Sequence, residues 1–199
     1  MEMTGEKLIP ASQQDTWKAL NDPDMLRACV PGCESITPVT DNEYQVQMTA
    51  KVGPVSAKFR GRLSLFDIKP PQSYSLAFEG QGGPAGFAKG AAQVRLAAVS
   101  PHETKLSYEV KANVGGKLAQ IGSRLVDAAA KKVADEFFQN FTKKMGASEE
   151  ETVVNAEPEH GHGSAAPDPA MPSVSNTTLI FFAAGALVVF IVALVALFG

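Results

Sequence analysis

Residues 117–145 constrain the fold of this chain more than any other stretch. Apolar side chains recur there at three- and four-residue steps: Leu118, Ile121, Leu125, Ala129, Val133, Phe137 and Phe141. This spacing places them on one face of a helix. Asp127, Lys131 and Asp135 fall on the other side, at spacings that suit i,i+4 ion pairs. A helix of this length measures about 43 Å, and its apolar face needs an equally long apolar surface, such as a curved sheet.

The residues before this helix have the period-two pattern of antiparallel strands. Residues 44–52 alternate cleanly, and Gly53-Pro54 reads as a two-residue turn. The turn sets a register in which Val52 pairs with Val55, Ala50 with Ala57, Met48 with Phe59, Val46 with Gly61 and Tyr44 with Leu63. In the later strands, the same alternation places the following residues on the inner face of the sheet: Tyr74, Leu76, Phe78, Gly90, Ala92, Val94, Leu96, Ala98, Leu106, Tyr108, Val110, Ala112 and Val114. A strand at residues 3–9 and two short helices, capped by Ser12 and Asp22, precede them. The pattern predicts an α+β domain in which one face of the sheet is wet and the helix covers the other.

The end of the chain has a different character. Residues 179–198 contain no charged or strongly polar side chain, and as a helix they span about 30 Å, which matches the apolar core of a bilayer. Residues 147–176 are rich in Glu, Pro, Ser and Ala and predict a disordered linker. We therefore divide the chain into a domain at residues 1–146, a linker at 147–176 and a transmembrane anchor at 177–199. The first ten residues lack a signal-peptide core, so we expect the domain to stay in the cytoplasm.

Charge and cysteine content narrow the possible partners. The stretch up to Lys144 holds all 18 basic residues and 15 of the 21 acidic ones, a net charge of +3. Its basic residues are scattered rather than clustered, which argues against nucleic-acid binding. Two cysteines, Cys29 and Cys33, are too few for a disulfide framework and fit a reducing compartment.

No sequence motif calls for catalysis. A nucleophile elbow, a phosphate loop and an H-E-x-x-H motif are all missing from the sequence. His160 and His162 lie in the linker, where two exposed ligands make a poor metal site. Cys29 and Cys33 read as small structural side chains that flank the Pro31-Gly32 turn. We predict no metal and no covalent cofactor.

The size of the inward side chains leaves two interpretations equally open. Small residues face the helix from the sheet: Ala50, Ala57, Gly61, Gly90, Ala92, Ala98 and Ala112. They permit either close packing of helix on sheet or a cavity wide enough for a hydrophobic ligand. The side chains that would line this cavity are Met48, Phe59, Leu63, Phe78, Leu96, Tyr108, Leu125, Ala129 and Val133.

Short motifs, spread in order along the domain, resemble those of the CoxG family of carbon monoxide dehydrogenase subunits. They are residues 21–24 (NDPD), 30–36 (VPGCESI), 51–55 (KVGPV), 59–61 (FRG), 86–91 (GFAKGA), 114–116 (VGG), 119–122 (AQIG) and 137–138 (FF). The resemblance implies a START-like helix-grip fold (SRPBCC superfamily), in which a curved antiparallel sheet grips a long C-terminal helix around a hydrophobic cavity. It also implies an accessory role beside molybdenum-containing carbon monoxide dehydrogenase or a related hydroxylase. No catalytic residue set comes with the family.

The sequence thus predicts a non-catalytic protein, tail-anchored in the cytoplasmic membrane, that recruits such an enzyme and binds a quinone or another lipid. The alternative is a plain anchor or assembly factor with a filled core. A third class, a small-ligand enzyme, needs an acid or base in the cavity. The only inward candidates for that role are Tyr44, Tyr74 and Tyr108.

Overall fold

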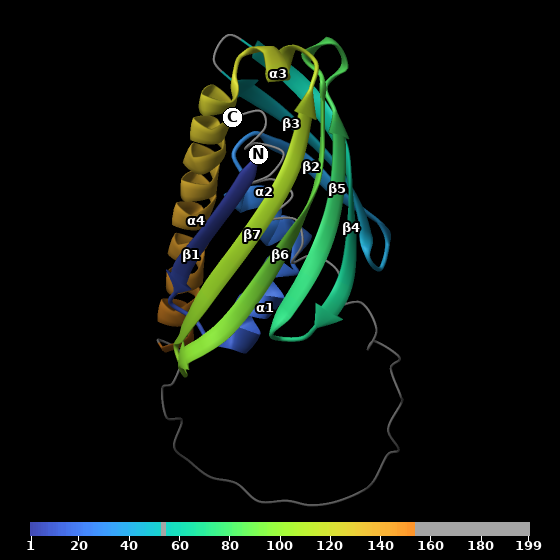
Figure 1. The fold of residues 1–199 in the computed structure, drawn as a ribbon. Coiled ribbons are helices and arrows are strands. Elements are labelled where there is room, and N and C mark those ends of the chain that lie inside the picture. The colour runs from blue at the N-terminus through green and yellow to red at the C-terminus, as the bar shows by residue number, and fades with distance from the viewer. Residues whose placement is uncertain (53–54, 154–199) are drawn as a thin grey trace, which may run out of the picture.

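The computed structural model describes residues 1–52 and 55–153. Within them, a 7-stranded antiparallel sheet has the strand order β1-β7-β6-β5-β4-β3-β2. The strands are β1 (Glu2–Ile9), β2 (Cys33–Thr40), β3 (Glu43–Val52), β4 (Val55–Lys69), β5 (Ser73–Gln81), β6 (Phe87–Ser100) and β7 (Glu103–Gly115). The sheet curves strongly, and helices lie on its concave side (Figure 1).

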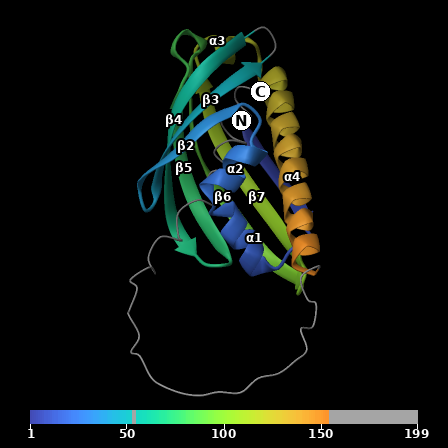
Figure 2. The same ribbon diagram turned by 180° about the vertical axis from the view of Figure 1, so that it is seen from behind.

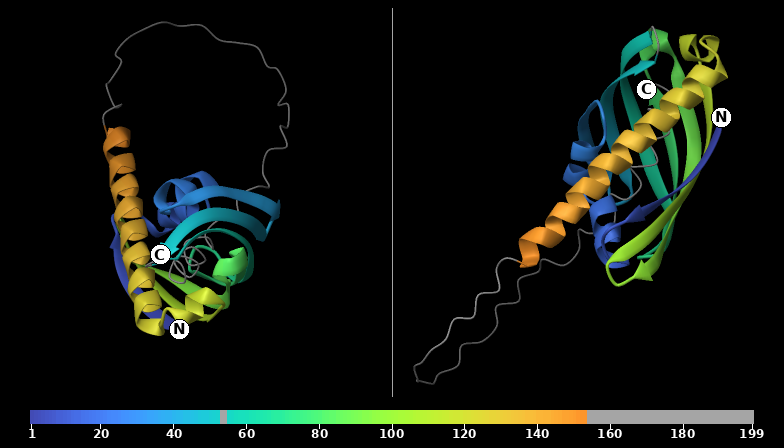
Figure 3. Two further views of the ribbon diagram at one scale, coloured as in Figure 1. Left: turned by 90° about the horizontal axis from the view of Figure 1, so that it is seen from above. Right: turned by 90° about the vertical axis from the view of Figure 1, so that its left-hand side faces the viewer.

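The concave side is occupied by α1 (Gln13–Leu20), α2 (Pro23–Cys29) and the long α4 (Ser123–Val153). Helix α4 packs against α2, β1 and β3, and so closes the concave side between the two margins of the sheet. Figures 2 and 3 show this closure from behind, from above and from the side. Two short helical turns, η1 (Gly83–Ala85) and α3 (Lys117–Gln120), lie at the end of the sheet where β7 ends and α4 begins.

The β3–β4 hairpin has the register predicted from its turn. Met48 pairs with Phe59 and Tyr44 with Leu63, and the Val52–Val55 pair closes the hairpin. All four of the larger side chains are buried on the concave face. Ala98 of β6 is the exception among the inward positions, because a register shift between Ala98 and Ser100 ends the regular pleat and leaves Ala98 exposed.

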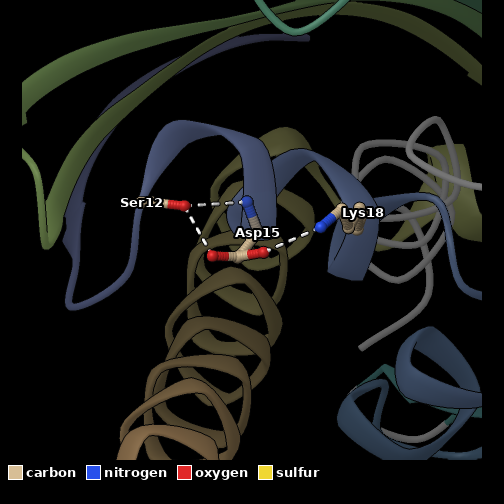
Figure 4. A network of polar contacts seen from close by, with 3 residues as sticks. All are labelled: Ser12, Asp15 and Lys18. Atoms are coloured by element: carbon tan, nitrogen blue, oxygen red, sulfur yellow. Dashed lines mark hydrogen bonds and ion pairs between the residues drawn. The ribbon is translucent and has the colours of Figure 1, made fainter. Parts of the chain in front are cut away.

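The two short helices begin at the predicted caps. Ser12 Oγ accepts a hydrogen bond from the backbone N–H of Asp15, and the Ser12 hydroxyl donates to the Asp15 carboxylate at 2.6 Å (Figure 4). Lys18 Nζ lies 3.1 Å from the same carboxylate. The hydrogen bond from Ser12, followed by that from Lys18, lowers the pKa of Asp15. Asp22 caps α2 through the N–H groups of Asp24 and Met25.

The prediction of one unbroken helix over residues 117–145 is wrong. The helix is interrupted after α3, because Gly122 adopts a left-handed conformation (φ 94°), and α4 starts at Ser123. Because of this interruption, the buried positions at the start of α4 lie one residue later in the sequence than predicted. Val126 and Ala130 are buried, whereas Leu125 is 53 % exposed and Ala129 is half-buried.

The predicted end of this helix at Gly146 is also wrong, because α4 continues to Val153. Residues 147–153, which the sequence assigned to the linker, are therefore helical. The rest of the predicted linker and the predicted membrane span at residues 179–198 lie outside the described residues. In the part of the chain that the structure describes, no helix is long and apolar enough to cross a membrane.

Candidate functional site

The concave face of the sheet is an apolar surface assembled from four central strands. Among the positions predicted to line a cavity, Met48, Phe59, Leu63, Phe78 and Leu96 are at most 4 % exposed, and so is Val133 of α4. Tyr108 and Ala129 are half-buried. Leu125 does not belong with them, since its side chain points largely into solvent. A role of these side chains in binding a ligand stays a prediction.

Aromatic rings occupy the space beside several glycines on or near this face. The ring of Phe59 lies against Gly82, and that of Tyr108 against Gly5 on the neighbouring strand β1. A Cβ added at Gly90 would lie 2.7 Å from Cζ of Phe78. Glycine at these positions is therefore required by close packing, and at Gly90 the small inward residue does not leave a void.

A second aromatic cluster joins α4 to the sheet. Phe137 packs edge-on against Phe138 at 5.1 Å between ring centroids and stacks on Phe141 at 5.5 Å. Tyr108 of β7 stacks on Phe138, also at 5.5 Å. Near this cluster, Asn140 Nδ2 donates to the backbone carbonyl of Cys29 and ties α4 to α2. The part of α4 from Val133 onward is therefore fixed firmly to the domain.

Two buried hydroxyl groups among residues 1–52 and 55–153 have no hydrogen-bond partner there. They are Tyr74 Oη on β5 and Thr16 Oγ1 on α1. Trp17, next to Thr16 in the chain, packs edge-on against the Tyr74 ring at 5.6 Å. An unpaired buried hydroxyl costs about 1–3 kcal/mol, so a ligand group that paired with either one would remove that cost. The sequence placed Tyr74 on the inner face, but period-two alternation gives no information on hydrogen-bond partners.

Burial keeps the inner tyrosines protonated. It raises the pKa of Tyr44 and Tyr74, and it raises the pKa of Tyr108 together with the nearby negative charge of Asp135. None of the three would be a phenolate at neutral pH. They are suited to donate hydrogen bonds rather than to act as a base.

Burial keeps the two cysteines protonated as well. Burial raises the pKa of Cys29 and of Cys33 to about 11, so both remain thiols at neutral pH and are weak nucleophiles. Both are free. Over residues 1–52 and 55–153, no three His, Cys, Asp or Glu side chains come close enough together to hold a metal ion. His160 and His162 lie outside the described residues.

A groove between β1 and α4, which the sequence did not suggest, opens at the side of the domain. Its volume is about 380 Å³, and its lining includes Gly5, Tyr108 and Lys131. Lys7 Nζ bridges it, 3.0 Å from Asp135 Oδ1 and 5.9 Å from the centre of the Phe138 ring. Asp135, predicted to pair with Lys131 along the helix, pairs with β1 instead. Local i,i+4 spacing could not reveal this partner, because Lys7 is far away in the sequence.

This geometry, a curved antiparallel sheet closed by a long C-terminal helix over an apolar concave face, defines the START-like helix-grip class. A conserved protein from Geobacillus kaustophilus has a similar structure, with a TM-score of 0.70 and 30% identity over 74% of this chain and 97% of that chain. The ZhuI aromatase/cyclase from Streptomyces sp. R1128 (TM-score 0.55, 13% identity) covers 78% of this chain and 97% of its own. A protein from Thermus thermophilus (TM-score 0.57, 12% identity) covers 74% and 99%. At these identities the last two show the fold alone.

The model of the CoxG family of carbon monoxide dehydrogenase subunits matches residues 5–146. The chain therefore belongs to the CoxG family, whose name associates its members with carbon monoxide dehydrogenase. A comparison with curated proteins gave no match.

Proposed function

We propose that this protein is a non-catalytic accessory protein that recruits a molybdenum-containing carbon monoxide dehydrogenase, or a related hydroxylase, to the cytoplasmic membrane. In this proposal residues 177–199 form the anchor, and the domain at residues 1–146 remains in the cytoplasm. The domain holds a quinone or another lipid on its concave face and so links the enzyme to the respiratory chain. The observation that carries the proposal is the match of the CoxG family model to residues 5–146.

The chemistry of the concave face supports a lipid-like ligand. Its large buried side chains, among them Met48, Leu63 and Leu96, offer apolar contacts without charge. The unpaired Tyr74 hydroxyl adds one hydrogen-bond donor within this apolar setting. A quinone has the matching composition, since an isoprenoid chain needs apolar contacts and a carbonyl oxygen accepts one hydrogen bond.

Cell fractionation tests recruitment. In cells that lack residues 177–199 of this protein, we expect carbon monoxide dehydrogenase activity to move from the membrane fraction to the cytosol. Activity with artificial electron acceptors should remain unchanged, because recruitment does not alter the enzyme itself. Loss of that activity as well would mean that the protein acts in assembly rather than in recruitment.

Solvent extraction tests the ligand. The full chain, purified in detergent from cells that make quinones, should yield a stoichiometric isoprenoid compound. Tyr74→Phe should reduce the amount recovered and leave the fold intact, because it removes only the unpaired hydroxyl. Tyr44→Phe is the matched control, since Tyr44 is also buried on this face. Equal recovery from both variants would exclude Tyr74 as the ligand contact.

The anchor-only alternative has its own supporting observation. The rings of Phe59, Phe78 and Tyr108 fill the space beside Gly82, Gly90 and Gly5, as expected for a filled core. Absence of any lipid from the purified protein would favour this alternative and would leave recruitment unaffected.

A further inference from the structure

One end of the sheet carries a surface with an unusual composition. Residues 82–89 form the connection from β5 to β6 and the start of β6, and residues 115–126 lead from the end of β7 into α4. The two segments meet there, and we call them the apical surface. A Cβ added at Gly116 would lie 3.2 Å from the carbonyl oxygen of Ala85 and closer still to Gly86. Gly86 and Gly116 both have positive φ (126° and 82°). Glycines thus let the two connections pack backbone against backbone as one continuous surface.

The apical surface combines exposed apolar side chains with positive charge. Phe87 is 46 % exposed and Leu125 is 53 % exposed. Lys89, Lys117 and Arg124 belong to the same two segments and are exposed, and none of the three takes part in an ion pair within the described residues. The two segments contain no Asp or Glu, but Glu79 of β5 is the cross-strand neighbour of Lys89, and Asp127 follows Arg124 by three residues in α4.

The opposite end of the sheet has a different charge pattern. The three turns there each carry an acidic residue at or beside the turn: Asp41 between β2 and β3, Asp67 before the β4–β5 turn and Glu103 after the β6–β7 turn. Lys69 and Lys105 lie beside two of the same turns, so this end carries charges of both signs, whereas residues 82–89 and 115–126 carry positive charge alone. This difference arises only when the antiparallel strands bring alternate turns to the same end.

We infer that the apical surface docks on an anionic lipid surface. Phe87 and Leu125 would enter the interface between headgroups and acyl chains, while Lys89, Lys117 and Arg124 would contact the anionic headgroups. A lipid surface suits these residues better than a folded partner, because exposed apolar and cationic side chains can enter a layer of anionic lipid without detailed shape complementarity.

This contact is distinct from the proposed anchor. Helix α4 begins at the apical surface and, with 31 residues, extends about 46 Å away from it. The chain that leads to the predicted span therefore leaves the described residues at the opposite end of the domain. The inference rests on the charge and exposure of the apical residues and not on the proposed function.

Tryptophan quenching by brominated lipid tests the contact in the full chain. Phe87→Trp places a reporter on the apical surface, and Phe66→Trp is its matched control, because Phe66 on β4 is 45 % exposed near the opposite end. The native Trp17 is buried and common to both. In brominated phosphatidylcholine vesicles that contain phosphatidylglycerol, we expect quenching of Phe87→Trp alone. Quenching should disappear without phosphatidylglycerol or at high salt. Equal quenching at both positions, or none at position 87, would overturn the inference.

Charge reversal provides the second arm. In the Phe87→Trp protein, Lys89→Glu, Lys117→Glu and Arg124→Glu together should weaken the quenching interaction by at least about a hundredfold, since each basic residue near an anionic surface contributes about fivefold. The control reverses Lys18, Lys69 and Lys105, which lie towards the other end, and should leave quenching unchanged. Leu125→Trp serves as an independent reporter if Phe87→Trp perturbs the packing on Gly115. Flotation of each variant with the vesicles reports the proposed anchor separately. Absence of quenching in the Phe87→Trp protein with retained flotation would therefore count against the apical contact and leave the proposed anchor unaffected.

Discussion

The two halves of α4 are packed in different ways. From Val133 onward the buried side chains are mostly large: Phe137, Phe138, Phe141 and Met145 are at most 5 % exposed. Before Val133 only Val126 and Ala130 are buried, and Leu125 points into solvent. Burial of a Phe or Met side chain contributes about 1.5–3 kcal/mol, far more than burial of an Ala. The free energy that holds α4 on the domain therefore comes mainly from its second half.

This difference separates stability from function along one helix. The second half fixes the helix through the aromatic cluster and through Asn140, which bonds to α2. The first half, with small buried side chains, contributes to the apical surface and faces the region proposed to hold a ligand. A helix that is anchored at one end can adjust at the other without unfolding. Four experiments test this contrast, starting with the one expected to have the largest effect.

Phe137→Ala should lower the free energy of unfolding by about 3–5 kcal/mol, because it empties a fully buried site between Phe138 and Phe141. Chemical denaturation measures the change. Phe87→Ala is the matched control on the apical surface and should cost much less, since Phe87 is about half exposed. A loss below about 1 kcal/mol for Phe137→Ala would mean that the second half of α4 does not dominate the packing.

A pair of alanines compares the two halves directly. Ala134→Phe should cost about 1–3 kcal/mol, because Ala134 is 1 % exposed within the packed core. Ala130→Phe, one turn earlier, should cost less than about 1 kcal/mol if ligand space lies beside it. The break at Gly122 makes Ala130 the better site for this test than Ala129, which is only half-buried.

Denaturation midpoints and extracted lipid should be measured for both alanine variants. If the proposed ligand is present, the amount of lipid recovered per folded protein should fall more in Ala130→Phe than in Ala134→Phe. Equal destabilisation by the two substitutions, with no lipid from the unsubstituted protein, would leave the filled-core alternative in place.

The accuracy of the sequence-based predictions also differs between regions. The β3–β4 register was predicted pair by pair, because a two-residue turn and strict alternation each specify it. The helix was predicted without its break at Gly122 and with Leu125 as an inward residue. Its apolar repeat continues across Gly122, and a repeat alone does not indicate that a glycine will adopt a positive φ. The strands that form the concave face were therefore better predicted than the helix that closes it.

The candidate site shows a similar limit. Inward orientation of Met48, Phe59 and Phe78 follows from local alternation, and the structure places all three on the concave face. The unpaired Tyr74 hydroxyl and the Lys7–Asp135 pair depend on which distant segments meet. The same is true of the apical surface, whose two segments become neighbours only through the sheet topology. Periodicity carries no information on such long-range neighbours.

The Lys7–Asp135 pair lies where the two halves of α4 meet, and its expected contribution is small. Both side chains are more than a third exposed, so water screens the attraction. A double-mutant cycle with Lys7→Met and Asp135→Asn should give a coupling energy of about 0.2–1 kcal/mol. The coupling should fall in high salt. A coupling above about 2 kcal/mol would make the contact with β1 a principal support of α4. The aromatic cluster would then no longer be the main contact that holds the helix on the domain.

Leu125→Ser should have the smallest effect on stability. It tests the contrast between the two halves of α4, because it alters an apolar residue of the first half that is not buried. The expected change in the free energy of unfolding is within about 0.5 kcal/mol, since the side chain is 53 % exposed. Leu118→Ser, just before the break at Gly122, is the matched control, because Leu118 is fully buried and its loss should clearly destabilise the domain. In the Phe87→Trp protein, Leu125→Ser should nevertheless reduce quenching by brominated anionic vesicles, because it removes one of two apolar side chains from the apical surface. A strongly destabilised Leu125→Ser protein would show that the first half of α4 supports the fold as the second half does, and the division of the helix into two roles would fail.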